Sequence, residues 1–158
     1  TVTFSSDARP FQQGVPVQSA RRDIQFHSGG TNFKPAVEMA CPILRKHKEY
    51  TPVMVFMSDG QGGSVDNELL REAKSLGKNF RFFAIAFNNS NPTQLQSMVD
   101  TLKKKGFSAK LLTSSSKAEL QHNFVEVAET SKVTELLQNA VGKKIAEAVG
   151  LRIALDHL

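Results

Sequence analysis

The sequence Pro-Val-Met-Val-Phe-Met-Ser-Asp-Gly, residues 52–60, decides the fold. Its apolar run, Val53–Met57, ends abruptly at the polar turn Ser58-Asp59-Gly60. The run is too short for a helix and lacks alternating polar residues, which is typical of a strand buried on both faces of a parallel sheet. We therefore predict that 53–58 is a central strand of an α/β fold.

The flanking sequence alternates between helix-like and strand-like segments. Apolar residues recur at helical spacing from Phe33 to His47, where Thr31 or Asn32 can cap the helix and Pro35 falls in its first turn. This alternation calls for right-handed crossovers and a mostly parallel sheet, so we expect a doubly wound three-layer α/β/α sandwich. The other elements expected are helix 66–76, strand 80–87, helix 95–102, strand 109–112 and helix 120–128.

The two ends of the chain are less regular. Residues 1–5 are predicted to form a short strand, and 7–25 a loop with a short edge strand near 15–18 or 23–26. One α/β domain is expected over 1–130, followed by a C-terminal helix and tail over 131–158. The apolar stripe of 133–149 indicates an amphipathic helix that either packs on the domain or docks onto a partner chain.

Composition excludes several classes of protein. The net charge of +5 comes from dispersed lysines, and with no Trp and one Tyr for base stacking we expect no nucleic-acid partner. The densest basic run, Lys103–Lys105, precedes Gly106 and is predicted to end a helix. No apolar run approaches the roughly 20 residues of a membrane span. The single Cys41 excludes an internal disulfide and is expected to be buried; the localisation stays open, with a slight preference for the cytoplasm.

Two turns carry the residues that suggest chemistry. Ser28-Gly29-Gly30-Thr31-Asn32 opens a helix, and Ser58-Asp59-Gly60 follows the most apolar strand. In a doubly wound sheet, ligands bind at the carboxyl ends of the strands, so the two turns should meet at one edge. An aspartate carboxylate and a threonine hydroxyl are oxygen ligands that suit Mg²⁺.

These two turns, with the strand Val2–Ser5 and the Phe-rich strand 82–87, resemble the von Willebrand factor A domain from its second strand onward. The resemblance covers roughly residues 1–128. It implies a metal-ion-dependent adhesion site in which Thr31 and Asp59 are metal ligands. It also implies partner binding at the sheet edge formed by Gly30, Thr31, Asn32, Asp59 and Gly60.

One part of the family pattern has no counterpart. The loop Asp-x-Ser-x-Ser, which ends the family's first strand, is missing, and Ser5-Ser6-Asp7 has the wrong order on the wrong strand. Three explanations stay open: a sequence incomplete at its start, which we favour, a strand supplied by another chain, or a rearranged domain. The resemblance implies Mg²⁺, or Mn²⁺ or Ca²⁺, in the complete domain. We expect weak or no binding by this chain alone, because two ligands hold a reluctantly dehydrated ion poorly.

The sequence thus predicts a protein-binding module, not an enzyme, which recognises an acidic side chain of a partner protein at this partial metal site. A second hypothesis is a metal-independent intracellular scaffold that binds through helix 133–149. A third is a hydrolase or phosphotransfer domain that uses Asp59, although no second carboxylate follows two residues later. The histidines at 27, 47, 122 and 157 show no metal-pair spacing, and His47 is expected on the apolar face of its helix.

Overall fold

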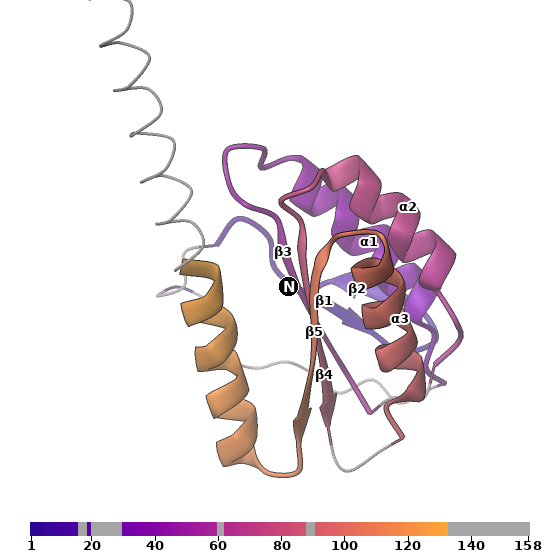
Figure 1. Ribbon diagram of the computed structural model, residues 1–158, viewed down its shortest axis with the longest axis vertical. Coiled ribbons are helices and arrows are strands. Elements are labelled where there is room, and N and C mark those ends of the chain that lie inside the picture. Colours follow the sequence, from indigo (N-terminus) through magenta and orange to yellow (C-terminus); the bar gives the residue numbers. More distant parts are fainter. Residues whose placement is uncertain (16–18, 20–29, 60–61, 88–90, 133–158) are drawn as a thin grey trace, which may run out of the picture. The chain divides into compact units, whose positions relative to one another are not determined.

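The computed structural model describes residues 1–15, 19, 30–59, 62–87 and 91–132 (Figure 1). The chain divides into two compact units, Thr1–Asn123 and Phe124–Leu158. Everything described below belongs to the first unit unless stated otherwise. None of the helices in the described ranges has the length and hydropathy needed to cross a membrane.

The first unit is a mixed α/β structure, which confirms the fold class at this coarser level. A three-stranded parallel sheet has the order β3-β4-β5, and a separate antiparallel hairpin is made of β1 and β2. A further helix begins at residue 117 and is described to residue 132, so its part after Asn123 belongs to the second unit. In chain order the elements are β1 (Val2–Phe4), β2 (Ala8–Pro10), α1 (Phe33–Arg45), β3 (Val53–Ser58), α2 (Asp66–Leu76), β4 (Arg81–Phe87), α3 (Thr93–Lys104) and β5 (Ser108–Ser114).

The position predicted for 53–58 is wrong within the described residues. β3 is an edge strand that pairs only with β4, and its Val55 and Met57 are 36% and 44% exposed. The strand that lies in the middle is β4, which is buried from Arg81 to Ala86. Both strands are apolar enough for a central position, and which of them has two neighbours depends on pairing with distant segments.

The loop predicted over 7–25 also needs correction at its start. Ala8–Pro10 forms β2, which pairs antiparallel with β1 so that Val2 lies opposite Pro10. A proline cannot donate to a ladder, and it is tolerated here at the end of an edge strand. The edge strands predicted near 15–18 and 23–26 fall almost entirely outside the described residues.

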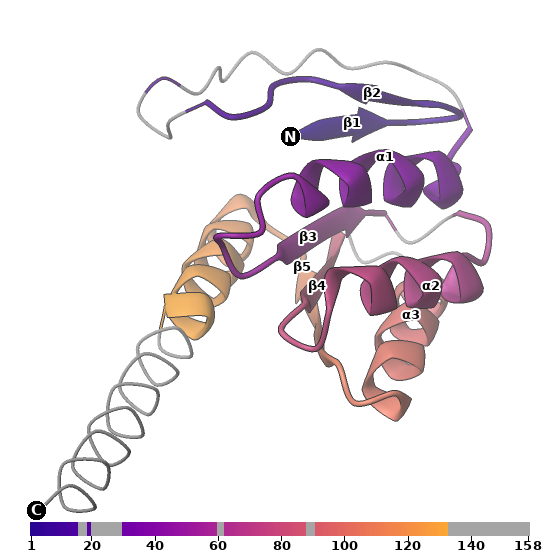
Figure 2. The same cartoon turned by 90° about the horizontal axis from the view of Figure 1, so that it is seen from above.

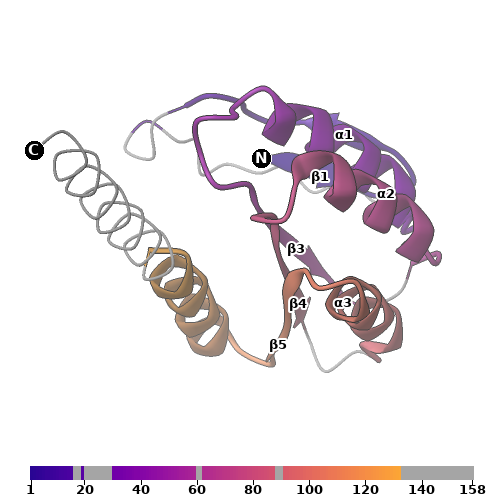
Figure 3. The same cartoon turned by 45° about the horizontal axis from the view of Figure 1, so that its top comes forward.

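One aromatic cluster joins the hairpin to the sheet. The Phe33 ring lies 6.1 Å from that of Phe4 and 5.0 Å from that of Phe56, measured between centroids, and both contacts are edge-on. Phe56 also lies 5.0 Å from Phe4 and 6.4 Å from Phe82 of β4. The cluster is the end of a core in which α1, α2 and α3 cover one face of the β3-β4-β5 sheet (Figure 3).

Helix α1 has a second partner in the hairpin. It contacts both β1 and β2 as well as α2, and Figure 2 shows the hairpin lying along it. The hairpin and the three-stranded sheet are therefore joined by one helix and by aromatic side chains. No ladder of backbone hydrogen bonds joins them in the described part of the chain.

The residues predicted to cap or end three of the helices are confirmed in that role. The side chain of Asn32 caps α1 by accepting from the Lys34 N–H, and α2 ends at Gly77, whose φ is +92°. The basic run ends α3 just before Gly106, with a φ of +82°. The prediction for His47 is wrong: α1 ends at Arg45, and the His47 side chain is 51% exposed and contacts Glu49.

Cys41 is fully buried in α1, as predicted. Burial, with the nearby Glu72 carboxylate, raises the pKa of its thiol to about 12. The thiol therefore stays protonated at neutral pH.

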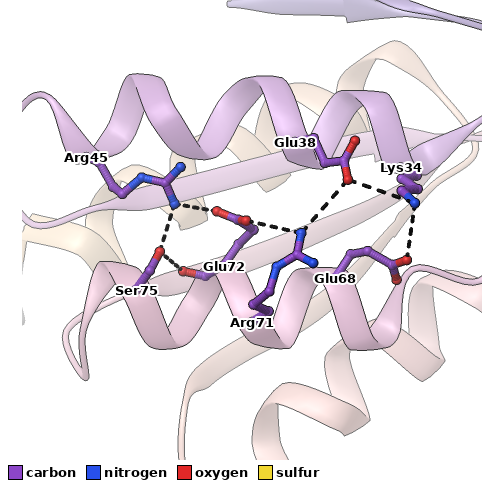
Figure 4. Close-up of polar contacts among 7 residues, drawn as sticks. All are labelled: Lys34, Glu38, Arg45, Glu68, Arg71, Glu72 and Ser75. Carbon is purple, nitrogen blue, oxygen red and sulfur yellow. Dashed lines mark hydrogen bonds and ion pairs between the residues drawn. The ribbon is translucent and has the colours of Figure 1, made fainter.

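Alternating charges line the outer side of α1 and α2 (Figure 4). Lys34 lies 3.7 Å from Glu68, and Arg71 lies 3.9 Å from Glu38. At the other end Arg45 pairs with Glu72 and donates to Ser75 Oγ at 2.8 Å. Each exposed pair contributes little alone, but together they fix how α1 lies against α2.

The start of helix 117–132 is capped by its own sequence. Ser116 Oγ accepts from the Glu119 N–H, and the Glu119 carboxylate accepts from the Ser115 N–H at 2.6 Å. The Ser115 N–H and the Ser115 hydroxyl both donate to the Glu119 carboxylate and so lower the pKa of this group. The buried Asn123 donates to the Thr113 carbonyl, which attaches the first turns of the helix to β5.

We predict that the aromatic cluster supplies a large share of the stability. Phe33→Ala should lower the free energy of unfolding by about 3–5 kcal/mol, because it removes a ring that is fully buried. Tyr50→Ala is the control, since Tyr50 is 68% exposed and should change the value by less than about 0.5 kcal/mol. Urea titrations followed by circular dichroism measure both, and equal effects would contradict the prediction.

Candidate functional site

Three segments meet at the edge of the first unit where β1 and β3 end. They are the hairpin turn Ser5–Asp7, the residues Gly30–Asn32 that lead into α1, and Ser58-Asp59, the last residue of β3 and the one that follows it. We refer to these three segments together as the rim. Hydrogen bonds join the hairpin turn to Gly30–Asn32. Aromatic packing joins the start of α1 to the end of β3.

The hairpin turn is joined to the start of α1 by hydrogen bonds. The Asn32 N–H donates to the Ser5 carbonyl at 2.8 Å, and Ser6 Oγ donates to the Gly30 carbonyl at 3.4 Å. Asp7 closes the turn, since its carbonyl accepts from the Ser5 N–H. Ser5-Ser6-Asp7 has the wrong order on the wrong strand for the family's missing loop, but it is hydrogen-bonded to the residues on either side of Thr31.

The end of β3 is joined to the start of α1 by the Phe33 ring. This ring packs on Phe56, two residues before the strand ends, and it also lies against Gly62 in the segment that follows Asp59. Thr31 directly precedes the helix that begins with Phe33. Thr31 therefore lies two residues before this ring in the chain, and Asp59 lies between two residues, Phe56 and Gly62, that contact it.

The side chains of the rim are open to solvent. Gly30, Thr31, Asn32 and Asp59 are all exposed. The Oδ1 of Asn32 is engaged in capping α1, so this residue has a structural role whatever else it contacts. Ser58 is buried and donates to Asp59 Oδ1 at 3.4 Å, which helps to orient the carboxylate.

The described donors fit a divalent ion only in part. The two residues that the resemblance assigns as ligands offer one carboxylate, from Asp59, and one neutral hydroxyl, from Thr31. Within the described ranges no group of three or more His, Cys, Asp or Glu side chains converges in a way that could hold a metal ion. Mg²⁺ gives up its hydration water reluctantly, and such a sparse donor set would hold it weakly.

Two residues that matter for the rim were missed by the sequence argument. The Gly62 N–H donates to Gln94 Oε1 of α3 at 2.7 Å, and Gly62 approaches the Phe33 ring too closely for a side chain. The Gly62-Gly63 pair was a visible signal of a tight turn. No local sequence pattern distinguished Gly62 from Gly63, and none indicated that Gln94 contacts this turn.

Other predicted residues lie outside the description. Gly60, predicted to contact a partner, falls in the gap at 60–61. The amphipathic helix 133–149 and the tail that follows it also lie outside the described residues, as does nearly all of the predicted segment 131–158.

Comparison with family models, with curated proteins and with solved structures gives no match for this chain. The resemblance to the von Willebrand factor A domain therefore rests on the two turns and on the strands that precede them. What the rim does must be argued from its geometry and chemistry.

We predict that Gly62 tolerates no side chain. A Cβ at this position would lie 2.4 Å from the Phe33 ring, which is itself held between Phe4 and Phe56 and cannot move aside without cost. Gly62→Ala should lower the free energy of unfolding by about 1–3 kcal/mol, the usual range for overpacking.

Gly63→Ala is the matched control, because a Cβ at Gly63 meets nothing within 4 Å. It should leave the free energy of unfolding within about 0.5 kcal/mol of the wild-type value. Chemical denaturation measures both variants. Similar destabilisation by the two would show that the backbone, not the Phe33 ring, requires glycine here.

Proposed function

We propose that the chain is a protein-binding module of the von Willebrand factor A type, which recognises a partner protein at the rim. In this proposal the complete fold is a doubly wound three-layer sandwich. Binding, not catalysis, is the activity. The observation that supports it most is the Phe33 ring, which follows the exposed Thr31 by two residues and packs on Phe56 and Gly62, between which the exposed Asp59 lies.

The chemistry of the rim is suited to a polar partner. The exposed Thr31 hydroxyl both donates and accepts hydrogen bonds, whereas the Asp59 carboxylate only accepts. The N-terminus of α1 adds the partial positive charge of the helix dipole beside Thr31. An acidic side chain could approach Thr31, while Asp59 requires a cation or a donor between itself and that side chain.

A bound divalent ion would supply that bridging charge and leave a coordination position open to the acidic side chain. Thr31 and Asp59 are the described residues that would hold it. Because they are only two, we propose that this chain alone binds Mg²⁺ weakly. Weak binding of metal would make recognition by the isolated chain correspondingly weak.

The other two hypotheses remain less supported. Metal-independent docking through helix 133–149 concerns residues outside the described part of the chain. Phosphotransfer by Asp59 would need further groups at the rim to bind and polarise a phosphate. Neither hypothesis gains an observation from the described residues, so binding at the rim is the function that we put forward.

The proposal predicts that a divalent ion reports on the rim even when it binds weakly. Mn²⁺ at sub-stoichiometric concentration should broaden the backbone amide signals of Thr31 and Asp59 selectively, because a paramagnetic ion relaxes nearby nuclei. Asp59→Asn and Thr31→Ala should each reduce that broadening, and excess Mg²⁺ should reverse it in the wild type.

Asp100→Asn is the matched control, since Asp100 lies on α3 and its Oδ1 can still accept from Gln96 after the substitution. It should leave the broadening at the rim unchanged. Broadening that is spread evenly over the surface carboxylates would refute a site at the rim. Tight, stoichiometric Mg²⁺ binding by calorimetry would instead refute the claim that the site is partial.

A further inference from the structure

Helix α3 contacts both ends of the described segment that follows Asp59. At one end Gln94 Oε1 accepts from the Gly62 N–H at 2.7 Å. At the other end Ser97 Oγ donates to Asp66 Oδ2, the first residue of α2, at 2.5 Å. Gln94 and Ser97 are three residues apart in one helix and so lie on the same face.

The segment between Gly62 and Asp66 is also held by packing on the core. Val65 is 1% exposed and belongs to the main core. Gly62 lies against the Phe33 ring of α1 while its N–H points to α3. This glycine is thus held between two helices, by packing on one and by a hydrogen bond on the other.

The helix that provides the anchors is itself firmly placed. Asn91 Oδ1 accepts from the Thr93 N–H at 3.1 Å, which fixes the start of α3 one residue before Gln94. Four residues on the inner side of α3 are buried to 1% exposure or less, namely Leu95, Met98, Val99 and Leu102. The backbone of Gln94 is therefore held in place by the packing of α3, and its side chain reaches from α3 to Gly62.

The second anchor matters for a charged group. Asp66 Oδ1 is buried and, among the described atoms, has no hydrogen-bond partner. Ser97 therefore gives this carboxylate its side-chain hydrogen bond through the other oxygen. The N-terminus of α2 also favours a negative charge at this position. Together these contacts hold the end of the segment at Asp66.

We propose that Gln94 is a positioning residue for the rim, and that α3 acts through Gln94 and Ser97 as a clamp on residues 62–66. Gly62 is only three positions beyond Asp59, so fixing it restricts where the carboxylate can lie. The clamp itself does not depend on the proposed function, but its importance for binding does.

The test replaces the acceptor without changing the size of the side chain. In Gln94→Met no oxygen remains to accept from Gly62, whereas in Gln94→Glu a carboxylate oxygen does. Amide hydrogen exchange by NMR on the full chain should be roughly threefold to tenfold faster at Gly62 in Gln94→Met, as expected for the loss of one hydrogen bond. Gln94→Glu should restore the exchange rate to near that of the wild type.

Gln96→Met is the control on the same helix, since it removes only the part-buried hydrogen bond to Asp100. It should leave Gly62 exchange and the Asp59 amide shift unchanged, while Gln94→Met should alter both. Unchanged Gly62 exchange in Gln94→Met would overturn the clamp. Equal acceleration in Gln94→Glu would also overturn it, because the effect would then not come from the acceptor.

A second readout separates the clamp from the function. Selective Mn²⁺ broadening at Thr31 and Asp59 should weaken in Gln94→Met and recover in Gln94→Glu. Broadening that is identical in the wild type and in Gln94→Met would overturn the role of Gln94 in positioning the rim. If the wild type shows no selective broadening but Gly62 exchange responds as expected, the clamp is supported and the proposed function fails.

Discussion

The burial of one aromatic ring, that of Phe33, is the contact on which the rest of the first unit depends. The Phe33 ring packs on Phe4 of β1 and on Phe56 of β3. In the described residues, β1 and β3 share no backbone hydrogen bonds. The ring is also the first side chain of α1. Fixing it therefore fixes where the helix begins, and with it the polar residues that precede the helix. An apolar contact in this way determines the position of a hydrophilic surface.

The elements of the fold could largely be predicted because their signals are local. Helix 66–76 is found with the predicted bounds, since apolar spacing and a terminal glycine both lie within the segment. The role of β3 could not be predicted in the same way. Val55 and Met57 are as apolar as the residues of β4, and only the pairing with distant strands decides that they are exposed. Similarly, the proline in β2 favours a loop until the partner strand is known.

The residues of the candidate site likewise divide into those with a local sequence signal and those placed by contacts with distant segments. Asp59 could be placed at the carboxyl end of a parallel strand from the order of elements alone. The same rule does not cover Thr31, because the strand described before it, β2, belongs to an antiparallel hairpin. The turn Ser5–Asp7 is held beside Thr31 by hydrogen bonds to Gly30 and Asn32, some 25 positions away, which no local pattern reports. Gly62 and Gly63 are identical in sequence terms, and only the crowding by Phe33 separates them.

The buried thiol of Cys41 gives α1 a chemical property that its surface does not reveal. Alkylating reagents attack the thiolate, and this group is both inaccessible and, with a pKa of about 12, almost wholly protonated. A reagent can reach it only when α1 detaches from the core. The rate at which Cys41 is alkylated therefore measures how often α1, which follows Thr31 in the chain, opens away from the core.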